Sequence, residues 1–183
     1  ETSINNKYIK IKKKKKKILN LDYIAEQLHK NTKHNIGFNI PKEEYYSESG
    51  NYNIDVLIIA LQELGYDSGL TNNYPDVLNH LRSDNLIGFI LNTGGHYVAL
   101  RVKPLTTKKN NTDKICNLHK NNKIKTDGTV NENIQVALIN STDANCKKQL
   151  NCVNLRDYLI PKYIDVNSGN INIGYGLLYV SEK

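Results

Sequence analysis

The first half of the chain carries apolar residues at helical spacing. Asn20 and Asn53 stand directly before two of these patterns, where an Asn side chain can cap the helix. Gly65 follows the second pattern and is placed to end it, and Pro75 is placed to open the third. Helices are therefore expected at 21–30, 53–64 and 75–83.

The second half shows the apolar runs and alternation of β-strands. Strands are expected at 86–92, 96–102, 134–139 and 174–180, with a shorter one near Leu70. The Thr-Gly-Gly between the first two of these strands is turn sequence, and residues 153–164 indicate a further helix, ended or interrupted by Pro161. Helices followed by mostly sequential strands predict an α+β fold, with an antiparallel sheet packed against helices.

Basic residues are concentrated in two stretches rich in Lys and Asn. Residues 7–20 carry eight Lys and no acid, and residues 103–133 carry a net charge of +4. Because the whole chain has a net charge of +7, the remainder is net acidic. We therefore expect one domain over 1–183, with 7–20 and 103–133 as low-complexity basic insertions that are solvated and mobile. The alternative is a nuclear-import or polyanion-binding tract, but Lys12–Lys17 lacks the interleaved Arg and aromatic residues of a nucleic-acid groove, so nucleic acid is not an expected partner.

Composition also argues against several classes of protein. The apolar runs are far shorter than the roughly 18 residues that cross a membrane, so no membrane partner is expected. Cys116, Cys146 and Cys152 are an odd set at irregular spacing, which fits a reducing compartment, cytoplasmic or nuclear, better than a disulfide framework. No paired Cys or His motif of a zinc site is present, so no metal is expected.

His96 is the first candidate for chemistry, because it follows Gly94-Gly95 at the start of an expected strand. Alternation places it on the same face as Val98 and Leu100, and the strand after the second insertion ends with Asn140 on its own apolar face. If Val102 pairs with Ile134, His96 falls opposite Asn140. An Asn beside an imidazole can fix its tautomer, which leaves the other ring nitrogen free to act as a base toward a thiol. The alternative is a His at a strand end and an Asn in a turn, with no shared role.

Several segments resemble the Josephin domain, a papain-like deubiquitinase family. The similarity lies in SGNYNIDVLIIALQELGYD (49–67), LIGFILN with GGHYVALRV (86–102), VALINST and the helix LDYIAEQL, and is absent from both Lys/Asn-rich segments. The resemblance implies a papain-like fold and cleavage of the bond at the C-terminus of ubiquitin by a Cys nucleophile. By motif position His96 would be the base and Asn140 the residue that orients it. The implied partner is ubiquitin or polyubiquitin, and no cofactor is required.

The nucleophile of the family has no counterpart in this sequence. Ser3-Ile4-Asn5-Asn6 resembles the end of the family's first helix, Thr2 takes the place of a His in that helix, and the nucleophile would fall two residues before Glu1. None of the three cysteines present has the setting of an activated thiolate. With no Met in the chain, we expect a truncated deubiquitinase domain that is inactive alone. The alternatives are a non-catalytic ubiquitin-binding module and a papain-like peptidase with another substrate.

Overall fold

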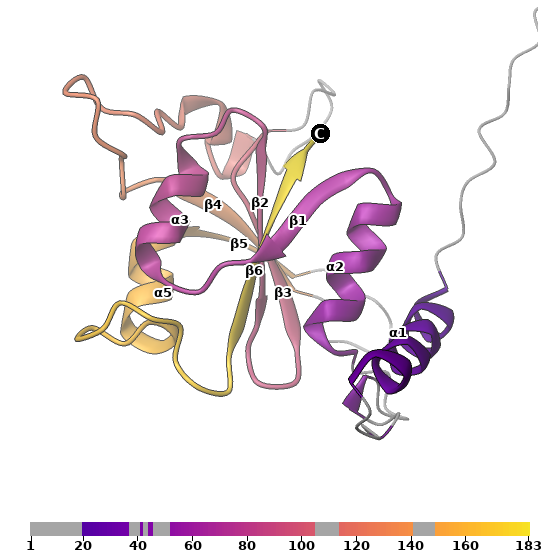
Figure 1. The fold of residues 1–183 in the computed structure, drawn as a ribbon. Coiled ribbons are helices and arrows are strands. Elements are labelled where there is room, and N and C mark those ends of the chain that lie inside the picture. The colour runs from indigo at the N-terminus through magenta and orange to yellow at the C-terminus, as the bar shows by residue number, and fades with distance from the viewer. Residues whose placement is uncertain (1–19, 37–40, 42–43, 46–51, 105–113, 141–148) are drawn as a thin grey trace, which may run out of the picture.

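A computed structural model describes residues 20–36, 41, 44–45, 52–104, 114–140 and 149–183 (Figure 1). In chain order the elements are α1 (Leu21–Ile36), α2 (Ile54–Glu63), β1 (Tyr66–Leu70), α3 (Tyr74–Leu81), β2 (Leu86–Asn92), β3 (Tyr97–Arg101), η2 (Leu118–Lys120), β4 (Gln135–Asn140), β5 (Gln149–Asn154), α5 (Leu155–Tyr163) and β6 (Gly176–Glu182). The six strands form one sheet in the order β1-β6-β2-β3-β4-β5, and every neighbouring pair is antiparallel. The expected α+β fold with an antiparallel sheet is confirmed.

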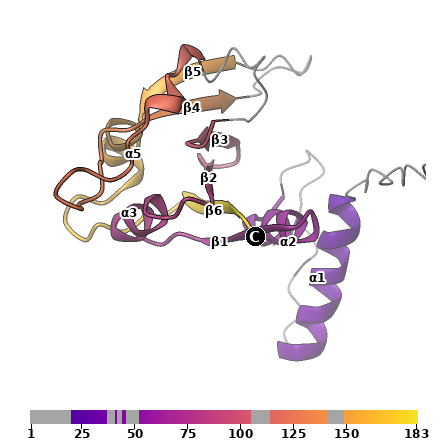
Figure 2. The same ribbon diagram turned by 90° about the horizontal axis from the view of Figure 1, so that it is seen from above.

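Helices lie on both sides of the sheet. Figure 1 shows α3 and α5 on one side and α2 on the other, with α1 beyond α2. The larger hydrophobic core joins α3 and α5 to the strands and includes Val77, Phe89, Leu100 and Leu159, each at most 1% exposed. A smaller core fastens α1 to α2, and Figure 2 shows that α1 makes this contact at a distance from the sheet. The helix pair α1–α2 therefore meets the sheet through α2.

Capping contacts confirm the predicted starts of α1 and α2 and the predicted end of α2. Asn20 Oδ1 accepts a hydrogen bond from Tyr23 N at 3.1 Å, and Asn53 Oδ1 accepts one from Asp55 N at 2.9 Å. Gly65, directly after the C-cap of α2, has φ +96°, a conformation that favours glycine. These local signals fixed the helix starts correctly, although α1 continues six residues beyond the predicted end at residue 30.

The predicted pairing of β3 with β4 is wrong by two residues. Ala99 lies opposite Ile139 and Leu100 lies opposite Leu138, whereas the predicted pairing of Val102 with Ile134 would place Leu100 opposite Val136. A tight turn fixes the register of a hairpin, but these strands are joined by a long connection that imposes none. Because side chains alternate with period two, a two-residue shift leaves every residue on its predicted face. The face that begins with Val98 and Leu100 is accordingly buried, as expected.

The sequence pattern missed β5 and misplaced the start of α5. Residues 149–154 form the edge strand of the sheet, and α5 begins only at Leu155, with Asn154 as its N-cap. Asn154 Oδ1 accepts a hydrogen bond from Asp157 N at 3.1 Å. Pro161 neither ends nor visibly interrupts the helix, because α5 continues to Tyr163.

Part of the second Lys/Asn-rich stretch is more ordered than its composition predicts. Cys116 and Leu118 are 2% and 1% exposed and pack against Ala137 of β4. The Asn121 side chain bonds both backbone groups of Gln135, with Nδ2 donating to the carbonyl at 2.7 Å and Oδ1 accepting from the amide at 3.2 Å. Residues 105–113 and 7–19 lie outside the described residues. Across the described ranges, no helix has the length and apolarity that crossing a bilayer requires.

Candidate active site

His96 is carried by a tightly bonded turn between β2 and β3. Gly94 and Gly95 have φ values of +93° and +103°, so the turn needs residues without a side chain at these positions. Asn92 Oδ1 accepts hydrogen bonds from both of their amides, at 3.0 and 2.9 Å. Thr93 bonds the carbonyl of His96 twice, through its amide at 2.8 Å and its hydroxyl at 3.1 Å. Thr93 therefore holds the backbone of His96, and Asn92 holds the two glycines that precede it.

Asn140 comes to the same place from a distant part of the chain. It is the last residue of β4, where it pairs with Gln149 of the edge strand β5. His96 Nε2 lies 2.5 Å from Asn140 Oδ1, and both side chains are half-buried. The structure thus brings together the two residues that the sequence singled out, 44 positions apart.

The contact determines which ring nitrogen can act as a base. A carboxamide oxygen only accepts hydrogen bonds, so the proton of the neutral imidazole lies on Nε2. Nδ1 then keeps its lone pair and can take a proton from a thiol. An imidazole held in this tautomer by an acceptor has the form that general-base catalysis requires.

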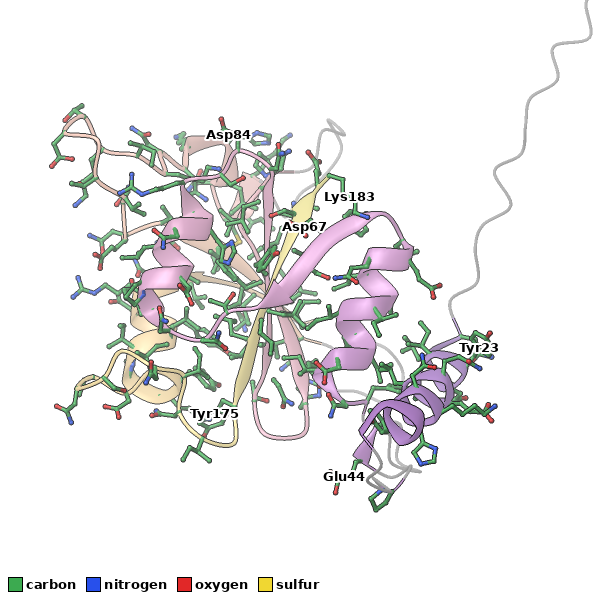
Figure 3. The ribbon with its side chains drawn as sticks, viewed as in Figure 1. Tyr23, Glu44, Asp67, Asp84, Tyr175 and Lys183 are labelled. Atoms are coloured by element: carbon green, nitrogen blue, oxygen red, sulfur yellow. A yellow bond between two sulfur atoms is a disulfide. The ribbon has the colours of Figure 1, made fainter. Side chains whose placement is uncertain are left out.

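A cleft lies beside the hairpin that carries His96. It has a volume of about 300 Å³ and is lined by Asn92, Tyr97, Gly174, Tyr175 and Gly176, together with residues 52–54 at the start of α2. Tyr175 lies at the end of the sheet where the β2–β3 hairpin turns, and its ring is within 3.8 Å of the position that a Cβ on Gly94 would occupy (Figure 3). Sequence reasoning did not assign Asn92 or Tyr97 to the site, although an Asn before Thr-Gly-Gly is typical of a side-chain-bonded turn.

The other described histidines have separate surroundings. The His80 ring on α3 stacks on Tyr179 at 4.0 Å between ring centroids, and burial lowers its pKa below the ordinary 6.5, against the opposing effect of Asp76 and Asp67. His29 on α1 meets Tyr45 edge to face, and His119 lies in η2. The described residues include no group of three or more His, Cys, Asp or Glu side chains that could hold a metal ion.

The cysteines do not behave as the sequence predicted. Cys116 and Cys152 form a disulfide between the second Lys/Asn-rich stretch and β5, although three irregularly spaced cysteines favoured free thiols. The fold brings them together because the segment before η2 packs over β4 and its neighbour β5. A disulfide sulfur has no thiolate to offer, so neither cysteine is a nucleophile in this form. Cys146 lies outside the described residues.

The fold and the His96–Asn140 contact define a papain-like α+β domain. The sequence model of the Josephin family matches residues 10–119, which is more than half of the chain. The chain therefore belongs to the Josephin family, a family of deubiquitinase-type cysteine proteases. The matched range includes His96 and ends before Asn140. No curated protein matches the chain.

Proposed function

We propose that this chain carries the base and the orienting residue of a deubiquitinase active site, which hydrolyses the bond at the C-terminus of ubiquitin or polyubiquitin. The observation that supports this most directly is the 2.5 Å contact between His96 Nε2 and Asn140 Oδ1. Membership of the Josephin family supports the reaction class. A cytoplasmic or nuclear location fits such a substrate, but the Cys116–Cys152 disulfide removes the free-thiol argument for a reducing compartment.

The geometry suggests the following course of reaction. A Cys thiol passes its proton to His96 Nδ1, and the thiolate attacks the carbonyl carbon of the last Gly of ubiquitin. The imidazolium then gives this proton to the leaving amine, and a thioester remains. Water, deprotonated by the same nitrogen, hydrolyses the thioester and releases the thiol. Asn140 Oδ1 accepts a hydrogen bond from Nε2–H throughout, so the ring keeps its orientation while it gains and loses a positive charge.

None of the cysteines of this chain is expected to supply the thiol in this scheme. Cys116 and Cys152 share a disulfide, and Cys146 stands in a polar stretch that lacks the sequence setting of an activated thiolate. We therefore expect the 183-residue chain to be inert toward ubiquitin derivatives. The same observation favours a second candidate, a non-catalytic module that binds ubiquitin without cutting it.

Turnover of ubiquitin carrying a C-terminal fluorophore separates the two candidates. The assay compares the chain as given with a version extended at its N-terminus by the family's Cys-bearing helix. Release of fluorophore by the extended protein, lost in its His96→Ala variant, supports the protease. A chain that binds ubiquitin in a titration but stays inert in both versions fits the binding module and contradicts the protease.

His96→Ala also provides the matched control. Removing a general base costs roughly 10²–10⁴-fold in rate, whereas ubiquitin binding to the surface around the site should change little. Equal turnover with and without His96 would remove the proposed role of the imidazole. An extended protein that cleaves an unrelated peptide as readily as ubiquitin would instead point to a papain-like peptidase of another specificity.

A further inference from the structure

Tyr97 joins the hairpin that carries His96 to the start of α2. Its Oη donates a hydrogen bond to the backbone carbonyl of Tyr52 at 2.7 Å, across 45 residues of sequence. Tyr97 Oη also accepts a hydrogen bond from Asn92 Nδ2 at 3.4 Å. Asn92 is the residue whose Oδ1 bonds the amides of Gly94 and Gly95. Burial is the main cause that raises the pKa of Tyr97 above its usual 10, so the hydroxyl keeps the proton that it donates.

The other end of this link is itself well anchored. Tyr52 precedes Asn53, the N-cap of α2, whose amide donates to the Tyr45 carbonyl at 2.8 Å. The Tyr52 hydroxyl donates to Asp22 of α1 at 2.8 Å. The Tyr97 hydroxyl therefore bonds the carbonyl of Tyr52, a residue that is itself fixed by contacts with α1 and the start of α2.

The link matters for His96 because α2 otherwise packs on the opposite half of the sheet, against β1 and β6. The Tyr97 hydroxyl joins the start of β3, directly after His96, to the residue that precedes α2. Loss of this bond would remove the link between α1–α2 and the residue next to His96, whose imidazole meets Asn140.

We propose that Tyr97 is a positioning residue for His96, whose phenol holds the hairpin where Nε2 meets Asn140 Oδ1. The catalytic meaning of this role rests on the proposed function, whereas the structural link does not. Tyr97→Phe keeps the ring and removes only the hydroxyl. It is expected to loosen the His96–Asn140 contact without unfolding the chain.

The test is the tautomer of His96 in the full chain, read from the ring-nitrogen chemical shifts of ¹⁵N-histidine-labelled protein and assigned with His96→Gln. Wild type should show the Nε2–H form. Tyr97→Phe should lower the ratio of Nε2–H to Nδ1–H by about fivefold, the factor expected when a typical hydrogen bond is lost. Tyr74→Phe is the matched control, because it removes a half-buried phenol of α3 whose hydroxyl bonds Glu132 and takes no part in the link between the hairpin and α1–α2.

An unchanged tautomer ratio in Tyr97→Phe overturns the proposal, and so does an equal change in Tyr74→Phe. If circular dichroism shows that Tyr97→Phe is unfolded, Asn92→Asp replaces it. The introduced carboxylate still accepts from Gly94 and Gly95, but it competes with the Tyr52 carbonyl for the single phenol proton, so the ratio should fall in the same direction.

The measurement needs neither a nucleophile nor ubiquitin, which separates its failure from failure of the proposed function. A lowered ratio together with an inert extended protein supports the link and contradicts the protease. Turnover by the extended protein with an unchanged ratio supports the protease and contradicts the positioning role of Tyr97. If both proposals hold, Tyr97→Phe in the extended protein lowers kcat and leaves KM nearly unchanged.

Discussion

Asn140 meets His96 along a diagonal of the sheet and not from the directly opposite position. The pairing of β3 with β4 reaches Ala99 opposite Ile139, which places Asn140 level with Val98, two residues from His96. Diagonal neighbours on one face are farther apart than direct partners, yet long side chains still meet across them. The 2.5 Å contact therefore uses the length of the imidazole and depends on how the turn presents it.

Asn140→Ala should lower kcat in the thiol-bearing extended protein and leave ubiquitin binding intact. A hydrogen bond to a charged group contributes about 1.5–3 kcal/mol, which corresponds to a loss of roughly 10- to 100-fold. Steady-state kinetics on fluorogenic ubiquitin give the two parameters separately. Asn140→Gln tests whether the acceptor or its position matters. A change confined to KM would contradict an orienting role.

The sequence predicted the His96–Asn140 contact correctly although the predicted register of β3 and β4 was wrong by two residues. Alternation places His96 and Asn140 on definite faces, and a shift by two residues preserves faces. The register itself depends on where a long connection delivers its strand, which no local pattern encodes. The helix starts were predicted correctly because the caps at Asn20 and Asn53 involve only residues two or three positions away.

Features that depend on tertiary contacts were missed. β5 is an edge strand in which Leu150 packs against the cluster of Cys116, Leu118 and Ala137 and Val153 packs against the main core, so its few apolar residues do not keep to one face. The partner of Cys152 lies 36 residues away in a Lys/Asn-rich stretch, and an odd number of cysteines gave no reason to pair them. The Tyr97–Tyr52 bond likewise joins a side chain to a distant carbonyl, which composition and periodicity do not report.

Gly88→Ala in β2 should destabilise the sheet more than Gly69→Ala in β1. A Cβ at Gly88 would lie 2.2 Å from the carbonyl oxygen of Leu100, a backbone atom fixed by strand pairing. Overpacking of this kind costs about 1–3 kcal/mol. Gly69→Ala is the control, because its Cβ would meet only the Tyr179 side chain, at 3.1 Å. Urea unfolding of both variants checks the difference, and equal losses would contradict the close approach at Gly88.

Reduction of the Cys116–Cys152 disulfide should lower the free energy of unfolding. Closing a loop with a sequence separation of 36 residues corresponds to roughly 4 kcal/mol in the chain-entropy description. Thiol counting in denaturant should find one free thiol before reduction and three afterwards. Cys152→Ser should show the same loss of stability without reductant, whereas Cys146→Ser should not. Three reactive thiols in protein purified without reductant would refute the pairing.

Stability should rise with pH through the range in which His80 titrates. Burial against Phe89 and Tyr179 lowers its pKa in the folded state below the unfolded value of 6.5. The unfolded chain therefore binds more protons between the two values, and protonation there favours unfolding. The contribution is fully present above 6.5 and is lost as the pH falls toward the folded pKa. Urea unfolding across this range should show the slope in wild type and a smaller slope in His80→Gln.

The effect of His80 can be separated from that of two aspartates. Hydrogen bonds lower the pKa values of Asp127 and Asp165 below 3.8, so these groups change stability only in more acidic solution. A slope of equal size in His80→Gln would assign the effect to another group.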